Sequence, residues 1–114
     1  MKKPKRVPKR GFYRHYKHDP KKGITNYSYE ILGVGVHTED ECRPEDINMM
    51  VYRPLYKDAF VYRAGKLFDL RPLGMFYEKA LWKGKKVIRF TLVTDKKLIA
   101  KLRKIRDRMY PRQN

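Results

Sequence analysis

The chain has 114 residues, and 29 lysines and arginines against 12 aspartates and glutamates give it a net charge of +17. Its single cysteine excludes an intramolecular disulfide, and no run approaches the roughly 18 apolar residues of a membrane span. With 41% hydrophobic residues it is too apolar to be wholly disordered, so we expect one small, soluble domain in a reducing, cytoplasmic compartment.

The positive charge is concentrated at the two ends of the chain. Residues 1–22 hold ten basic side chains and one acidic side chain, whereas residues 23–90 hold eleven basic and nine acidic side chains. Residues 91–114 again have an excess, with eight basic and two acidic side chains. A near-neutral domain with basic ends is typical of a protein that binds a polyanion, and nucleic acid is the commonest one.

Residues 1–10 are expected to form a disordered basic arm. The segment contains two prolines and six basic residues, and it offers almost nothing to bury. Such an arm binds phosphate backbones with little sequence preference. Two other interpretations stay open, namely a solvated tail that aids solubility and, if the host is eukaryotic, a nuclear localisation signal.

Two strands are expected early in the domain. Residues 27–36 are rich in aromatic and β-branched side chains, and residues 49–53 resemble a second strand that ends at Pro54. The polar, acidic segment between them, residues 37–46, indicates a loop.

The next segments suggest two hairpins. Residues 59–63 and 66–70 flank Ala64 and Gly65, and residues 77–82 and 86–93 flank a Lys-Gly-Lys sequence. Residues 71–74 indicate a turn. Short strands separated by turns predict that residues 11–93 form a mainly β domain, a small five-stranded curled sheet or barrel.

Residues 94–110 are expected to form a basic amphipathic helix. Thr94 or Asp95 can cap it, apolar residues recur at helical spacing, and Pro111 ends it. Its apolar side is expected to dock on the sheet, and its basic side is either a solvated surface or a phosphate-binding ridge.

The middle of the chain resembles the family catalogued as domain of unknown function 1653. The resemblance covers about residues 11–90 and rests on motifs in the family's order: Gly11-Phe12-Tyr13-Arg14-His15-Tyr16-Lys17, His37-Thr38-Glu39, Met50-Val51-Tyr52-Arg53-Pro54-Leu55-Tyr56, Arg71-Pro72, Met75-Phe76 and Arg89-Phe90. Residues 18–26 and 40–48 are longer than the family's usual connections, and both basic tails are additions. The resemblance implies a compact β-rich module, and it implies no activity.

The motifs supply a set of side chains for a candidate anion pocket. Arginine forks match phosphate or carboxylate, and tyrosine and histidine rings stack on bases. The alternative is structural, with the arginines pairing with Glu30, Glu39, Asp69 and Glu78. The pocket set is Arg14, His15, Tyr16, His37, Tyr52, Arg53, Arg71 and Arg89.

Metal and catalytic sites are not expected. His15, His37, Glu39 and Cys42 lack the spacing of metal ligands, and Cys42 lies in an acidic loop that disfavours a thiolate. No phosphate-cradling glycine motif is present, because Gly33 and Gly35 lack the third glycine and the following helix. No cofactor is therefore expected.

The leading hypothesis is a non-enzymatic nucleic-acid-binding protein, with RNA favoured over DNA and a ribosome- or ribonucleoprotein-associated role. The arm and the helix would clamp the backbone together. The alternatives are a small enzyme or reader of an anionic ligand, and an adaptor whose basic ends dock on an acidic protein. The expected nucleic-acid-binding residues are Lys2, Lys3, Lys5, Arg6, Lys9, Arg10, Arg14, Lys17, Lys97, Lys101, Lys104 and Arg108.

Overall fold

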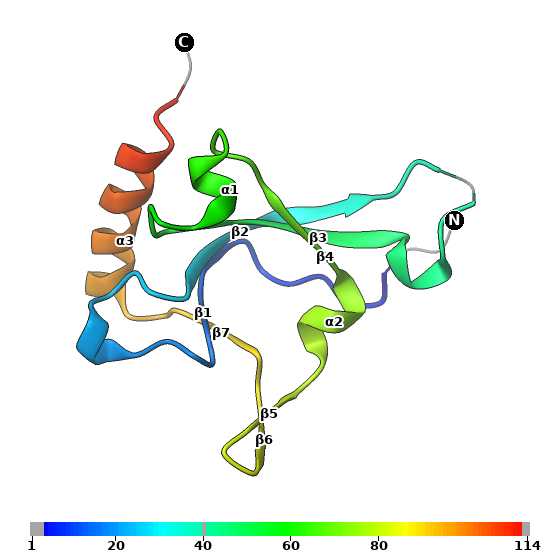
Figure 1. The fold of residues 1–114 in the computed structure, drawn as a ribbon, viewed down its shortest axis with the longest axis horizontal. Coiled ribbons are helices and arrows are strands. Elements are labelled where there is room, and N and C mark those ends of the chain that lie inside the picture. Colours follow the sequence, from blue (N-terminus) through cyan, green and yellow to red (C-terminus); the bar gives the residue numbers. More distant parts are fainter. Residues whose placement is uncertain (1–3, 40, 113–114) are drawn as a thin grey trace.

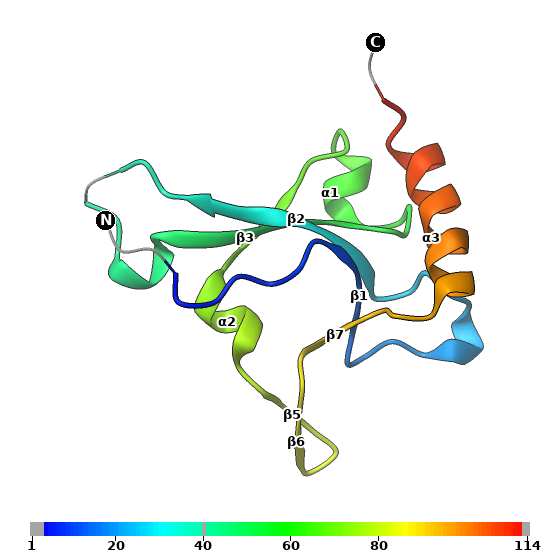
Figure 2. The same cartoon turned by 180° about the vertical axis from the view of Figure 1, so that it is seen from behind.

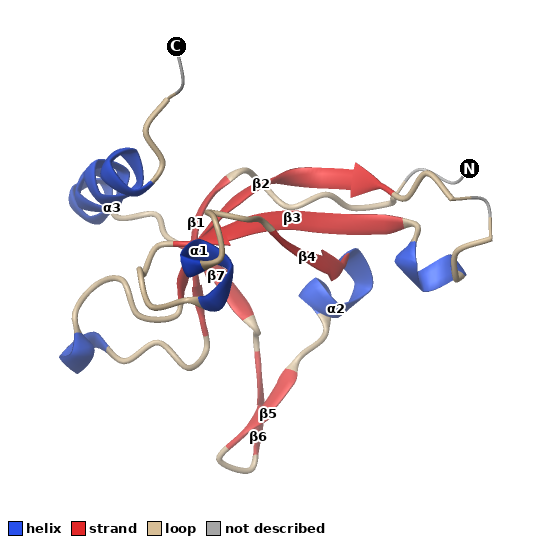
Figure 3. Cartoon of the chain, turned by 45° about the horizontal axis from the view of Figure 1, so that its top comes forward, coloured by secondary structure: helices blue, strands red, loops and turns tan. Residues whose placement is uncertain are grey.

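The computed structural model describes residues 4–39 and 41–112, and its centre is a five-stranded antiparallel sheet (Figure 1). The strand order is β4-β3-β2-β1-β7, and the sheet is strongly curled (Figure 3). Its strands are β1 (Gly11–His15), β2 (Ser28–Val36), β3 (Asn48–Pro54), β4 (Asp69–Pro72) and β7 (Phe90–Leu92). Among the described residues the outer strands β4 and β7 do not pair, so the sheet is open and the fold is the curled sheet rather than the barrel.

Strand alternation gives the sheet two faces with separate cores. The short helix α2 (Leu73–Tyr77) packs on one face, where Phe76 meets Tyr13, Tyr52 and Phe90. We call this the α2 face. The helix α3 (Lys96–Met109) packs on the other face, the α3 face, where Leu102 meets Phe12.

The expected C-terminal helix is confirmed. Asp95 is its N-cap residue, and the helix ends at Met109, two residues before Pro111. Leu102 and Met109 are fully buried, and Leu98 and Ile99 pack against the core cluster that contains Leu102. Burial of these side chains by the sheet stabilises the helix more than its own hydrogen bonds do. The described part of the chain contains no helix with the length and apolarity to span a bilayer.

The two early strands and the second hairpin are found in the structure. The strands expected at 27–36 and 49–53 are confirmed as β2 and β3, and a short helical turn, η2 (Pro44–Asp46), lies in the loop between them. The central part of the second hairpin is confirmed as β5 (Ala80–Trp82) and β6 (Lys85–Val87), which form their own two-stranded sheet. Its expected ends at 77–82 and 86–93 are wrong, because Tyr77 belongs to α2 and Phe90–Leu92 form β7, which pairs with β1. Another short turn, η1 (Pro20–Lys22), follows β1.

The hairpin expected at 59–70 is wrong. Residues 60–63 form a helical turn, α1 (Phe60–Arg63), in which the Arg63 amide donates to the Ala59 carbonyl. Tyr62 packs edge-on against Tyr110 after α3, and this distant contact outweighs the local β propensity of the segment. The turn expected at 71–74 is also wrong, because Arg71 and Pro72 belong to β4 and α2 begins at Leu73.

The described part of the basic arm, residues 4–10, lies against the domain in an irregular conformation. The Arg6 guanidinium lies 4.3 Å from the centre of the Tyr77 ring, and Pro8 is buried. The Tyr13 hydroxyl donates a 2.7 Å hydrogen bond to the Lys9 carbonyl. These contacts hold residues 4–10 beside α2, with their lysine and arginine side chains exposed.

Candidate functional site

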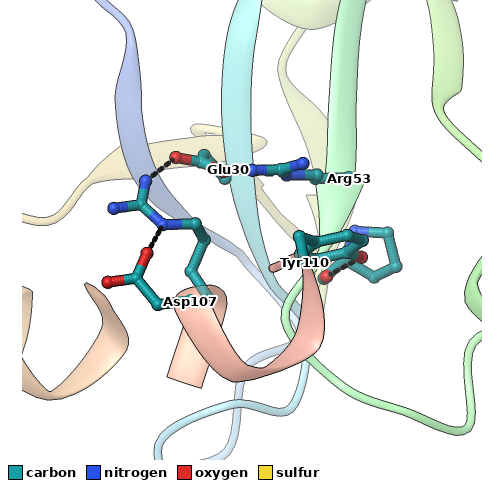
Figure 4. A network of polar contacts seen from close by, with 6 residues as sticks. Glu30, Arg53, Asp107 and Tyr110 are labelled. Atoms are coloured by element: carbon teal, nitrogen blue, oxygen red, sulfur yellow. Dashed lines mark hydrogen bonds and ion pairs between the residues drawn. The ribbon is translucent and has the colours of Figure 1, made fainter. Parts of the chain in front are cut away.

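On the α3 face, a buried carboxylate holds two arginines (Figure 4). Glu30 accepts from Arg53 at 2.8 Å through one oxygen and from Arg106 at 2.5 Å through the other. The Arg53 guanidinium also lies 4.0 Å from the centre of the Tyr110 ring, whose hydroxyl donates to the Pro54 carbonyl. Arg53 therefore ties α3 to the sheet, as the structural interpretation expects, and it is not free to bind a ligand.

Two further members of the predicted pocket lie elsewhere. Arg14 is on the α3 face, in a small cavity beside Asp95 and Leu98, and its buried Nε has no partner among the described residues. His37 follows the far end of β2, where its Nδ1 accepts from the Glu39 amide. The structure does not bring either residue together with the rest of the predicted pocket.

The remaining members gather on the α2 face. The Tyr52 hydroxyl accepts from Arg71 Nε at 3.4 Å, and the Arg71 guanidinium lies 5.9 Å from the centre of the Phe90 ring. His15 meets the same Phe90 ring edge-on at 5.2 Å. Arg89 donates to a backbone carbonyl, that of Glu78. Within the described residues, neither Arg71 nor Arg89 has a carboxylate within ion-pair distance.

His15 is uncharged on this face. Burial, together with the smaller effect of the positive charges of Lys17, Arg89 and Arg71, lowers its pKa from 6.5 to about 4. Its Nδ1 accepts from the Lys17 amide at 3.2 Å, so the proton of the neutral ring is on Nε2. A neutral histidine surrounded by three cations is a ring for stacking and a hydrogen-bond donor.

Three polar residues that the predicted anion pocket did not include also lie on this face, namely Tyr29, Tyr56 and Asp69. The hydroxyls of Tyr29 and Tyr56 are 2.7 Å apart, and burial raises the pKa of both tyrosines. Asp69 lies opposite Tyr52 in the register of β3 and β4. Burial raises the pKa of the Asp69 carboxyl, although the positive charge of Arg71 opposes this shift. Only the register between β3 and β4 brings Asp69 here, and no motif in the sequence signals it.

A cavity of about 490 Å³ lies between the arm and the sheet. We call it the arm cleft. Its cationic lining residues are Arg6, Lys9, Lys79 and Arg89, and its aromatic ones are Tyr13, Phe76, Tyr77 and Phe90. No carboxylate is among the described residues that line it. The cleft opens on the α2 face, where Arg89 is common to it and to the cluster around His15.

The basic side chains of α3 form a separate surface. Lys97, Lys101, Lys104 and Arg108 are exposed, while Leu102 and Met109 on the opposite side are buried. The start of the described arm lies at one end of the molecule and α3 at the other (Figures 1 and 2). A ligand that contacts both must follow much of the 46 Å long axis, so the two basic segments do not form one compact clamp.

The remaining residues of the predicted binding sets lie in the arm or just after β1, apart from two that fall outside the described residues. Lys5 and Arg10 are exposed in the arm, and Lys17 is exposed after β1, while Lys2 and Lys3 lie outside the described residues. Tyr16 follows β1 and lies 4.2 Å from His15 between ring centres. In the described ranges, no group of three or more histidine, cysteine or acidic side chains is placed to hold a metal ion.

Comparison with known proteins identifies the family. Searches of curated proteins and of solved structures each returned no match to this chain. A family model described as a protein of unknown function (DUF1653) matches residues 11–92, which span the whole sheet from β1 to β7. The basic arm and α3 lie outside the matched residues. Because this match covers well over half of the chain, the protein belongs to the DUF1653 family.

Proposed function

We propose that this protein binds nucleic acid without catalysing a reaction, that single-stranded RNA is favoured, and that the α2 face is the binding surface. The arm cleft is the observation that carries the proposal. Four cations converge on a cavity with aromatic walls, and no described carboxylate competes for them. Cations interleaved with aromatic rings suit a strand whose phosphates and unpaired bases alternate.

The charge pattern supports a phosphate backbone over a neutral ligand. Residues 79–94 contain five basic side chains and no acidic one, and this run borders the cleft through Lys79 and Arg89. Binding would release counterions from the backbone, which provides affinity without sequence preference. A ribonucleoprotein- or ribosome-associated role fits such a surface.

RNA is favoured over duplex DNA because of the elements that the fold presents. A major-groove reader presents an exposed helix, usually within a helix pair. Here the only long helix among the described residues, α3, uses its apolar side to cover the sheet. Small β modules with exposed rings read unpaired strands instead.

The salt dependence of affinity tests the proposal. We expect the affinity for an oligoadenylate of about twelve nucleotides to fall steeply between about 50 and 200 mM salt. Replacing Arg6 and Lys9 together by alanine should weaken binding about ten-fold and reduce the slope by about one unit. The matched control replaces Arg63 and Lys66, which are exposed on α1 and just after it, and should change neither quantity much.

Two results would reject the proposal. Salt-independent binding would exclude a backbone contact. A preference for polyglutamate over RNA at equal ionic strength would indicate an acidic protein as the partner.

A second candidate function rests on the cluster of His15, Tyr52, Arg71 and Arg89. Two arginines without a carboxylate partner beside a neutral histidine suit a phosphorylated or other anionic small ligand. Calorimetry with inorganic phosphate and a mononucleotide tests this function. Binding that persists in a variant lacking residues 1–10 and 95–114 would favour it over the RNA proposal, provided that the variant still unfolds cooperatively.

A further inference from the structure

Four rings from three separate segments form a continuous row. Trp82 of β5 meets Tyr16 edge-on with 5.3 Å between ring centres, and Tyr16 meets His15 at 4.2 Å. His15 then stacks on Tyr27 at 5.6 Å with 28° between the ring planes. The row thus joins the projecting β5–β6 hairpin to the turn before β2 (Figure 1).

Both ends of the row are open to solvent. Trp82 is 39% exposed and Tyr27 is 42% exposed. Large rings are usually buried more than this, because each exposed ring leaves apolar area in water. Strand alternation places Trp82 on the same side of the hairpin as the buried Ala80, toward Tyr16, so the hairpin holds the indole against the row.

Tyr27 is held in an unfavourable backbone conformation. Its φ is 51°, a left-handed value that is rare for a residue with a bulky side chain. The surrounding structure maintains it, since the His15 amide donates to the Tyr27 carbonyl at 2.8 Å. Strain of this kind is concentrated at functional positions, and here it accompanies an exposed ring.

Cations border the row along its length. Lys83 Nζ is 5.7 Å from the centre of the Trp82 ring, and Lys17 Nζ is 5.9 Å from that of Tyr16. Arg71 and Arg89 are close enough to lower the pKa of His15. Exposed rings with positive charge beside them are the combination with which single-strand binders hold bases and phosphates.

We propose that Trp82, Tyr16, His15 and Tyr27 form a base-stacking row for unpaired RNA bases, with Lys17 and Lys83 contacting the phosphates. The proposal rests on the proposed function and names the part of the α2 face that holds the bases. The row gives little sequence preference, because every base has an aromatic face. It requires unpaired bases, because a duplex buries those faces in its own stack.

Trp82 is the only tryptophan and therefore reports on the row directly. We expect an unlabelled oligoadenylate of about twelve nucleotides to change its fluorescence in step with binding. Trp82→Ala and Tyr27→Ala should each weaken binding about ten-fold, while Trp82→Phe and Tyr27→Phe should keep most of the affinity, because a ring suffices for stacking. Phe60→Ala removes an exposed ring outside the row, on α1, and should have no effect.

The outcomes separate this proposal from the function on which it rests. If the protein binds oligoadenylate but both alanine variants bind equally well and the tryptophan signal stays constant, the stacking row is wrong and the proposed function stands. If an RNA duplex binds as tightly as the single strand, the stacking row and the preference for single strands are both wrong, and only nucleic-acid binding by the α2 face stands. If the unchanged protein binds no RNA, both proposals fail. Cooperative unfolding of each variant, followed by circular dichroism, shows that a loss of binding is not a loss of fold.

Discussion

On the α3 face Arg53 and Arg106 contact a carboxylate, whereas on the α2 face Arg71 contacts an aromatic ring and a hydroxyl. Glu30 neutralises Arg53 and Arg106 in a buried network. Arg71 lies over Phe90 and contacts Tyr52, and no described carboxylate pairs with it. The same residue type thus stabilises the fold on one face and remains available for an anion on the other. A count of arginines in the sequence cannot make that distinction.

The largest expected effect is on stability, from a substitution on the α3 face. Glu30→Gln should lower the free energy of unfolding by about 3 kcal/mol, because it removes the counter-charge of the largely buried Arg53 guanidinium and leaves Arg106 with only its exposed partner Asp107. Urea denaturation measures it. Asp46→Asn is the control, since its partner Arg43 is exposed and an exposed ion pair contributes little to stability. Equal losses in the two variants would contradict the structural role of Glu30.

Arg71→Ala should show the opposite pattern. We expect its affinity for oligoadenylate to fall about ten-fold while its free energy of unfolding changes by less than about 1 kcal/mol, because no described carboxylate lies within ion-pair distance of its side chain. Fluorescence anisotropy measures the affinity, and urea denaturation measures the free energy of unfolding. A large loss of stability with unchanged affinity would mean that both faces use arginine structurally.

The fold was largely predictable because its signals are local. The alternation in β2 and β3, the Lys-Gly turn of β5–β6 and the helical spacing in α3 all lie within single segments. The segment that became α1 was misread because Phe60, Val61 and Tyr62 favour a strand locally, and the packing of Tyr62 on Tyr110 decides the outcome. The strand β1 was recognised only as a family motif.

The site was less predictable because it depends on contacts between distant segments. Arg106 and Glu30 are 76 residues apart in sequence, and nothing in either segment signals their pairing. Register across β3 and β4 decides that Arg71 and Asp69 share a face with Tyr52, while alternation sends Arg14 and Arg53 to the other face. Trp82 did have a sequence signal, as the only tryptophan within an acid-free basic run.

The pH dependence of stability tests the environment of His15. Its pKa is lowered from 6.5 to about 4 in the folded state, so the unfolded chain binds more protons between these values. The contribution of His15 is therefore complete above pH 6.5 and is lost as the pH falls toward 4. Because His15 is only half-buried, solvent screening reduces this loss to about 1 kcal/mol.

His15→Gln isolates that contribution from the carboxyl groups that titrate at lower pH. Urea denaturation at several pH values should show a flatter stability profile between pH 6.5 and 4 for the variant than for the unchanged protein. Parallel profiles would mean that the cations around His15 do not act on its ring.

The smallest expected effect concerns α3. Replacing Lys97, Lys101, Lys104 and Arg108 by alanine should weaken binding of a strand of about six nucleotides by less than about two-fold, because such a strand fills only the α2 face. A longer strand should show a larger effect, as these exposed side chains reach its phosphates. A large loss of affinity for the short strand would mean that the binding site is on α3 and not on the α2 face.

Photocrosslinking to a thiouridine-labelled single strand, followed by mass spectrometry of the joined peptides, tests the central claim most directly. The account predicts crosslinks on the α2 face, within residues 4–17, 27–29 and 79–90. Crosslinks confined to residues 96–109, or none at a salt concentration where the protein is folded and the strand is in excess, would contradict it.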